Sequence, residues 1–370
     1  CLMCLAIVSV LWVIYGYSLA FGHSKGFLAP YIGGLDWFML KGVDMNLPNP
    51  DYAATIPHQA YMIFQCMFAA ITPGLVIGAF AERVKFSAWV VFTVLWLTFV
   101  YCPLAHMVWA SDGLVGHIWG ALDFAGGTVV HMNAGIAGLA AALYLGKRVG
   151  TDKQGMHNVP YVMIGASLLW FGWFGFNAGS ALTAGGLATN AFVVTNTAAA
   201  AAAISWAVCE WLVTGKPTIV GAASGAVAGL VAITPASGFV NVAGALCIGL
   251  VVSVICFSMV AFVKPKLGYD DTLDAFGVHY IGGLWGALAT GLFAIKAINS
   301  AGASGLFEGN PVQLVVQLKA CLLTSVFSFV GTWIICLIID KTMGMRVVPE
   351  EEVIGLDLSQ HHERAYTILD

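Results

Sequence analysis

Residues 159–209 read VPYVMIGASLLWFGWFGFNAGSALTAGGLATNAFVVTNTAAAAAAISWAVC, and no Asp, Glu, Lys or Arg lies between Gln154 and Cys209. A membrane-spanning helix needs about 20 largely apolar residues, so this run predicts two consecutive spans. The segment NAGSALTAGG, at 177–186, holds the small and polar residues expected of the turn between them. The sequence therefore predicts an integral membrane protein.

The composition of the whole chain leads to the same class. Hydrophobic residues make up 59% and charged residues 9%, and the mean hydropathy is +0.87. A soluble domain carries roughly 25% charged residues, so this chain cannot cover a water-facing surface. No basic run exceeds two residues, which excludes a nucleic-acid partner. The nine cysteines lie mostly in apolar runs, so we expect reduced thiols, with no cofactor and no metal.

Charged and turn residues divide the chain into ten predicted spans. They lie near 1–21, 58–80, 86–109, 124–145, 158–178, 188–213, 219–235, 240–263, 275–296 and 313–340. Because the first of them starts with the chain itself, we expect a fragment that lacks its natural N-terminus. Glycine and alanine are frequent in the spans and let helix backbones approach closely, so we expect a compact bundle.

The basic residues predict the orientation of the bundle. One set of connections, together with the tail, holds Arg83, Lys85, Lys147, Arg148, Lys153, Lys216, Lys264, Lys266, Lys341, Arg346 and Arg364. The opposite side holds Lys25, Lys41 and Lys296, with Lys319 inside the outer half of the last span. Cytoplasmic loops carry the excess of Lys and Arg, so both ends of the chain are expected in the cytoplasm. We expect the turn with Glu82, Arg83 and Lys85 to be solvated there.

Two predicted spans share a histidine followed by two glycines at one spacing. The motif occurs as His131-x3-Gly135-x2-Gly138 and as His279-x3-Gly283-x2-Gly286, with Asp123 and Asp274 upstream. The two spans are expected to run in opposite directions. This pattern is typical of transporters built from inverted repeats, whose sites lie between the repeats. Chance matching in glycine-rich helices remains the alternative.

Ionisable residues inside the predicted spans need a physical explanation. His131 follows Asp123 by about eight residues, roughly 12 Å deeper at 1.5 Å per residue. Such a group is expected to face a cavity or a partner, although a core histidine bonded to a backbone carbonyl is the alternative. His279 would lie nearer the cytoplasmic end if its helix starts where we expect. Asp123 either attracts a cation or caps its helix.

Four aromatic residues and one serine are candidates for a cation site. Trp109 closes the third predicted span, and Phe68, Trp173 and Phe176 lie in others, with Ser180 one helical turn after Phe176. An aromatic face can bind a small cation, best when it is tryptophan. Anchoring at the membrane interface is the alternative for Trp109.

Several segments resemble one known family. They are FAAITPGLVIGAFAER (68–83), AHMVW (105–109), DFAGGTVVHMNAGIAGL (123–139), WFGFNAGSA (173–181), FGVHYIGG (276–283) and the tail RVVPEEEVIGLDLSQHHERAY (346–366). Together they are similar to the Amt/Mep/Rh ammonium transporters, closest to the bacterial Amt branch. The resemblance spans nearly the whole chain in the expected order.

The resemblance implies an all-α polytopic transmembrane bundle that transports ammonium and is not an enzyme. The family has eleven helices, and the first has no counterpart here. Residues 1–340 would form the transporter domain, with two inverted repeats and a pore in each protomer of a homotrimer. Residues 341–370 would form a cytoplasmic tail. The protein would lie in the inner or plasma membrane, with a PII-type signalling protein as a candidate partner. The tail reads His361-His362-Glu363, where the family usually has glycine in the middle position, which weakens that inference.

The resemblance also implies site residues. Trp109, Phe68 and Ser180 would bind ammonium at the outer side, and Asp123 would support the site and assist deprotonation. Phe68 and Phe176 would form an aromatic gate.

His131 and His279 would be paired in the pore, with Trp173 as a neighbour. A bare cation is expensive in an apolar pore, so ammonia would cross with or without the proton. Two other readings remain: an ammonium sensor of the same fold, and a membrane redox protein with His131 and His279 as haem ligands.

Overall fold

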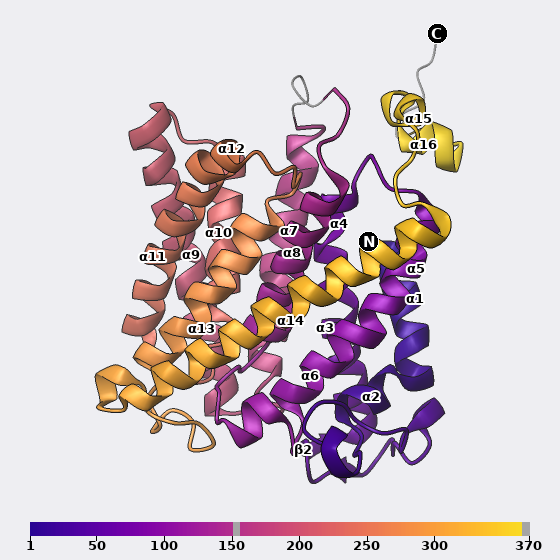
Figure 1. Ribbon diagram of the computed structural model, residues 1–370. Helices are drawn as coiled ribbons and strands as arrows, with labels where there is room; N and C mark the ends of the chain where they lie inside the picture. The colour runs from indigo at the N-terminus through magenta and orange to yellow at the C-terminus, as the bar shows by residue number, and fades with distance from the viewer. Residues whose placement is uncertain (151–155, 365–370) are drawn as a thin grey trace.

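The computed structural model describes residues 1–150 and 156–364 and consists mainly of long helices lying side by side (Figure 1). The first half contains α1 (Leu2–Leu11), η1 (Trp12–Gly16), α2 (Tyr17–Phe21), η2 (Gly26–Leu28), η3 (Phe38–Leu40), β1 (Pro48–Asn49), β2 (Ala53–Pro57), α3 (His58–Leu75), α4 (Ile77–Phe80), α5 (Phe86–Trp96), η4 (Leu97–Tyr101), α6 (Cys102–Trp109), η5 (Leu114–Ile118), η6 (Gly127–Met132) and α7 (Asn133–Leu145).

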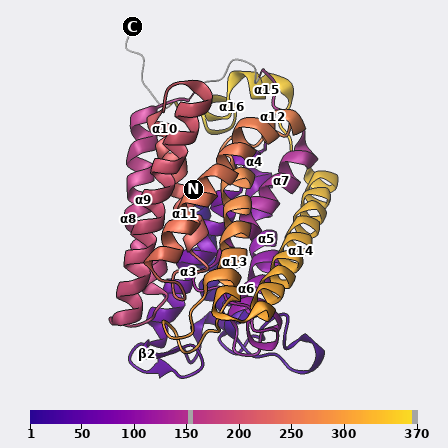
Figure 2. The same ribbon diagram turned by 90° about the vertical axis from the view of Figure 1, so that its left-hand side faces the viewer.

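The second half continues with α8 (Val159–Gly179), α9 (Gly186–Thr214), α10 (Ile219–Ile233), α11 (Val242–Ser258), η8 (Met259–Val263), α12 (Lys264–Leu267), η9 (Phe276–Tyr280), α13 (Ile281–Phe293), η10 (Leu306–Glu308) and α14 (Pro311–Met343). The tail forms α15 (Pro349–Ile354) and α16 (Leu356–His361). Figure 2 shows α8 and α9 at one edge of the molecule and α14 at the opposite edge.

Within the described residues, eight helices are long and apolar enough to cross a membrane. They are Leu2–Phe21, His58–Phe80, Phe86–Ile118, Gly127–Leu145, Val159–Gly179, Gly186–Thr214, Val242–Leu267 and Pro311–Met343. Each overlaps an expected span. The remaining two expected spans hold the shorter helix α10, of 15 residues, and the continuous pair η9 and α13. The fold is therefore the expected all-α membrane bundle.

Close packing at small residues holds the second half together. A Cβ added at Gly229 of α10 would lie 2.5 Å from the Ala198 carbonyl oxygen of α9, and one at Gly249 of α11 would lie 2.3 Å from the same atom. The backbones of α9, α10 and α11 therefore touch where lipid gives no hydrophobic drive to associate.

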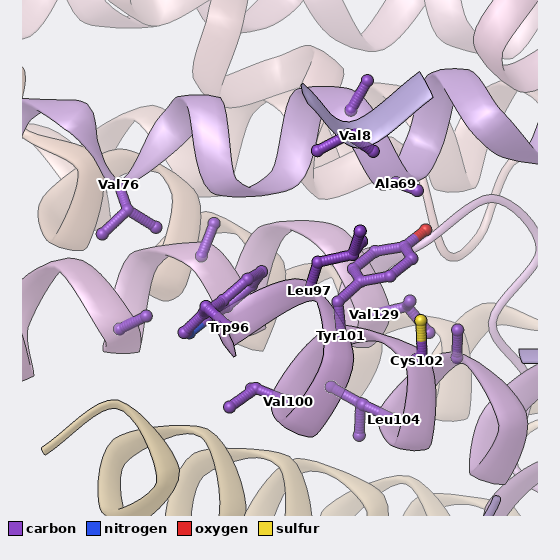
Figure 3. Close-up of a cluster of buried hydrophobic side chains, with 14 of the residues drawn as sticks. Val8, Ala69, Val76, Trp96, Leu97, Val100, Tyr101, Cys102, Leu104 and Val129 are labelled. Carbon is purple, nitrogen blue, oxygen red and sulfur yellow. The ribbon is translucent and has the colours of Figure 1, made fainter. Parts of the chain in front are cut away.

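Larger side chains form the core of the first half. Trp96, Leu97, Tyr101 and Leu104, from the continuous run of α5, η4 and α6, are almost completely buried beside α3 (Figure 3). Trp96 Nε1 also donates to Thr332 Oγ1 of α14 at 2.9 Å, so the last span is fixed to this core.

The tail lies at the same end of the bundle as the basic loops (Figure 1). Arg346 donates to the Leu145 and Lys147 carbonyl oxygens, and Glu352 accepts from Val149 N at 2.6 Å. This grouping agrees with the expected asymmetry of Lys and Arg, although Lys153 lies outside the described residues. At His362 the backbone has φ 55°, in the left-handed region that glycine favours. This is the tail position at which the family resemblance implies glycine.

The expectation that the turn at Arg83 is solvated was wrong for Arg83 itself. Its side chain is 0% exposed, and its guanidinium donates to the Ala79, Gly146 and Asp270 carbonyl oxygens and to the Asp270 carboxylate. The planar fork of donors explains the burial, because five N–H groups can satisfy several oxygens at once. Arg83 thus joins α4 to the segments that follow α7 and α12.

Candidate functional site

One small cavity brings together three of the predicted site residues. It has a volume of about 180 Å³ and is lined by Asp51, Tyr52, Tyr61, Phe64, Gln65, Phe68, Trp109, Phe124, Ser180 and Leu182. Phe68 comes from α3, Trp109 ends α6, and Ser180 follows α8. The Phe68 and Trp109 rings meet edge to face at a centroid distance of 5.6 Å. An aromatic wall with a hydroxyl group beside it is suited to a small cation.

Hydrogen bonds fix two of these groups. Trp109 Nε1 donates to the Asp123 carbonyl oxygen at 3.0 Å, which fixes the plane of the indole ring. The Ser180 hydroxyl donates to the Phe176 carbonyl oxygen at 2.8 Å, so its oxygen keeps lone pairs for an incoming donor. The sequence pointed to Phe68, Trp109 and Ser180 but missed Tyr61, Phe64 and Gln65. Their only sequence signal is a spacing of one turn (Phe64, Gln65) or two turns (Tyr61) from Phe68 on the same helix.

Two phenylalanine rings close the inner side of this cavity. The Phe68 and Phe176 centroids lie 4.3 Å apart, and Phe176 lies 6.0 Å from the His131 ring. Phe68 is 1% exposed. The predicted gate pair therefore stands in contact between the small cavity and His131.

The two predicted histidines meet inside the bundle. His279 Nδ1 lies 3.3 Å from His131 Nδ1, so one nitrogen donates and the other accepts. His131 is 0% exposed, and its Nε2 is buried without a hydrogen-bond partner among the described residues. Direct bonding between the rings leaves no place for a tetrapyrrole between them, so the geometry does not fit haem ligation.

The same local backbone carries each histidine. His131 lies in the π-helical turn η6 and His279 in the π-helical turn η9, and each turn leads into an α-helix of 13 residues. Single π turns occur often at functional sites. The π turn that carries His279 begins at Phe276. The sequence placed His279 nearer the cytoplasmic end than His131, yet the two rings meet.

Trp173 covers one face of the pair. Its ring stacks on His131 at a centroid distance of 5.2 Å and an interplanar angle of 18°. The indole nitrogen donates to Thr234 Oγ1 at 2.8 Å, so the ring has one fixed orientation. Thr234 follows α10 and was not identified from the sequence.

An apolar cavity of about 750 Å³ reaches His279 from another side. Trp173, Phe176 and His279 line it together with apolar residues of α1, α3 and α8. A cation in such surroundings loses its hydration without replacement, whereas a neutral molecule loses far less.

Asp123 holds a loop and does not line the small cavity. Its carboxylate accepts from the Gly126, Gly127 and Thr128 backbone N–H groups at 2.6–2.8 Å and from the Thr128 hydroxyl. The helix begins at Gly127, later than the sequence suggested, and the carboxylate satisfies its first donors. Gln317 of α14, missed from the sequence, holds the preceding residue by accepting from Leu122 N at 2.7 Å and donating to its carbonyl oxygen at 2.8 Å.

Acidic residues cluster at the end of the bundle that carries the tail. Although burial opposes ionisation of Asp270, hydrogen bonds from Arg148 and the charge of Arg83 lower the pKa of its carboxyl. Asp271 is 0% exposed, and burial raises its pKa to about 6. Its Oδ2 accepts from Phe276 N at 2.8 Å, which fixes the start of the helix that carries His279.

A bundle of membrane-spanning helices with a small cavity walled by aromatic rings and a buried histidine pair is typical of a polytopic membrane transporter. The model of the Ammonium Transporter Family matches residues 1–366. The chain is 51% identical over 362 residues to the ammonium transporter of Bacillus subtilis, an alignment that covers 98% of this chain and 88% of that protein. The chain belongs to the ammonium transporter family, whose members are transporters and not enzymes.

Solved structures agree with this assignment. The crystal structure of Candida albicans Mep2 is 37% identical and superposes with a TM-score of 0.88, covering 95% of this chain and 78% of that one. A structure described as a sensor Amt protein is 29% identical, with a TM-score of 0.86 over 97% of this chain and 88% of that one.

Proposed function

We propose that the small cavity captures ammonium before it crosses the membrane. The faces of Trp109 and Phe68 attract the cation, and the Ser180 oxygen accepts one of its N–H groups. Cation–π attraction contributes about 0.5–2 kcal/mol, which suits a transporter that must also release its substrate. Asp123 supports the site by holding the loop whose carbonyl oxygen orients Trp109, and its partly buried negative charge favours a cation nearby. The family membership supports ammonium as the substrate.

Passage beyond the gate proceeds as ammonia. The Phe68 and Phe176 rings must part to admit the substrate, and the apolar walls beyond them penalise a charge. Ammonium therefore gives up its proton at the gate. The bonded pair of His131 and His279 then supplies polar contacts along the path, and the unpartnered His131 Nε2 is the atom available to accept a hydrogen bond or the proton. Trp173 keeps the His131 ring in its plane.

The assembly and orientation are parts of the same proposal. Residues 1–340 form the transporter domain within a homotrimer in the inner or plasma membrane, and residues 341–370 form a cytoplasmic tail. The excess of basic side chains at the end that carries the tail supports this orientation. A PII-type protein is the candidate partner for that face.

The single observation that carries the proposal is the contact between the histidine rings at the inner side of the aromatic cavity. A sensor of the same fold is less favoured, because the Bacillus subtilis relative at 51% identity is named an ammonium transporter, whereas the structure described as a sensor is 29% identical.

The test is a current measurement on a solid-supported membrane, with the protein in liposomes and an ammonium gradient. We expect a saturable current that the double substitution His131→Ala and His279→Ala abolishes or changes in ion selectivity. His117→Ala, at an exposed histidine, is the matched control and should leave the current unchanged. The absence of both a current and a change of pH inside the liposomes, with folded and trimeric protein, would overturn the proposal and favour the sensor.

A further inference from the structure

A third buried histidine lies one helical turn before Trp109. His106, on α6, is 0% exposed, and both of its ring nitrogens contact backbone oxygens. Nδ1 lies 3.0 Å from the Ala20 carbonyl oxygen, and Nε2 lies 2.7 Å from the Ala29 carbonyl oxygen. A carbonyl oxygen only accepts, so each contact requires an N–H on the ring. Neutral imidazole carries one N–H, and the two contacts together require the doubly protonated ring.

A carboxylate supplies the matching negative charge. Asp112 Oδ1 lies 3.4 Å from His106 Nε2, in the short turn between α6 and η5. This oxygen is buried and has no hydrogen-bond partner within residues 1–150 and 156–364. A buried cation is tolerated where it is paired and its donors are satisfied, and an isolated buried carboxylate oxygen is costly. The carboxylate therefore supplies the negative charge that a charged ring needs, and the ring compensates the buried carboxylate oxygen.

The contacts of His106 join three separate segments beside the proposed ammonium site. Ala20 lies near the end of the first span, Ala29 in the loop that follows η2, and His106 on the helix that ends at Trp109. The same loop is tied a second time, because Leu114 N donates to the Pro30 carbonyl oxygen at 3.0 Å. The position of the Trp109 backbone thus depends on a clamp whose centre is the His106 ring.

We infer that His106 is a buried imidazolium that positions Trp109 for ammonium binding. The inference rests on the proposed function only in assigning ammonium to the cavity. Loss of either ring proton would set a bare nitrogen against a carbonyl oxygen, and the two lone pairs would repel. The clamp would then loosen, and ammonium would be captured less tightly at alkaline pH.

Asp112 is the carboxylate that the structure places against the ring. The surrounding elements carry other titratable side chains that have different partners or face outward. On α2, the Tyr17 hydroxyl bonds to His58. His117 on η5 and Lys25 before the outer loop are exposed.

The protonation state can be measured without any transport assay. Protein labelled with ¹⁵N at histidine, in lipid bilayers, would be studied by solid-state NMR beside His106→Gln and His117→Gln. At pH 7.5 we expect the signal lost in His106→Gln to be that of an imidazolium. The signal lost in His117→Gln, from an exposed histidine, identifies a second ring in the spectrum for comparison. A neutral His106 at this pH would overturn the inference while leaving the proposed function intact.

Two variants test the coupling to the site. His106→Gln keeps one donor and loses the other with the charge, so we expect KM for ammonium to rise about tenfold with little change in kcat. His117→Gln should leave KM unchanged. An unchanged KM in folded His106→Gln protein would overturn the positioning role.

Asp112→Asn keeps the shape of the side chain and removes the counter-charge. We expect the His106 imidazolium signal to disappear at a lower pH than in the parent protein. This measurement also decides the matter if His106→Gln fails to fold, and an unchanged titration would overturn the pairing.

Discussion

The Nδ1 atoms of His131 and His279 lie 3.3 Å apart, and neither ring nitrogen can donate unless the other accepts. The two side chains therefore work as one unit in any process that moves a proton or orients a neutral molecule. We expect His131→Ala and His279→Ala to reduce ammonium current by similar factors, with the double substitution costing little more than either single one. Current recordings on all four proteins at one expression level would measure this. Losses that multiply would show that the two rings act independently.

The approach of Gly135 to Tyr280 sets the distance between the helices that carry the pair. A Cβ added at Gly135 would lie 2.3 Å from Tyr280 N and 2.6 Å from Tyr280 Cβ, so the backbone itself would have to shift. We expect Gly135→Ala to lower the free energy of unfolding by about 1–3 kcal/mol and to reduce transport strongly. Thermal melting in detergent and liposome currents would report both effects. Gly165→Ala, where nothing lies within 4 Å, should leave stability unchanged or raise it by up to about 1 kcal/mol.

Asp123 accepts several hydrogen bonds that an amide cannot replace. Asn at this position keeps one acceptor oxygen and turns an NH2 group toward backbone donors. We expect Asp123→Asn to cost about 1–3 kcal/mol of stability and to raise KM, because the loop also orients Trp109. Melting temperature and the ammonium dependence of the current would test this together. Full stability with normal KM in this variant would contradict the role assigned to the carboxylate.

The buried carboxyl of Asp271 predicts a pH dependence of stability. Burial raises its pKa to about 6 in the folded protein, above the value of about 3.9 in the unfolded chain. The folded state therefore binds more protons between these values, and its stability falls as pH rises through this window. The penalty is complete above pH 6 and is on the order of 3 kcal/mol.

Asp271→Asn resembles the protonated form and should be free of that penalty. We expect a higher melting temperature than the parent protein at pH 7.5 and an equal one near pH 4. Glu350→Gln, at an exposed acidic residue, serves as the control and should show no such difference. A constant gap between Asp271→Asn and the parent across this range would argue against titration of Asp271.

The sequence predicted the residues of the site better than the contacts that hold them. Apolar runs bounded by charged residues predicted the spans, because the thickness of the bilayer fixes their length. The repeated histidine motif pointed to His131 and His279. The hydrogen-bond partners of these residues could not be predicted from the sequence. Thr234 bonds Trp173 across 61 positions, and Gln317 bonds Leu122 across 195. Such pairings depend on how the helices cross. The burial of Arg83 was missed for the same reason, because most of the oxygens that satisfy it come from two distant segments, at Gly146 and Asp270.

The two π turns that carry the histidines, η6 and η9, make transport sensitive to insertions and deletions. A π turn holds one residue more than an α-helical turn, and each extra residue advances a helix by about 100° and 1.5 Å. Removing one residue from η6 would rotate His131 away from His279, although composition and mean hydropathy would hardly change. The histidines thus face one another only while the extra residue is kept in both η6 and η9.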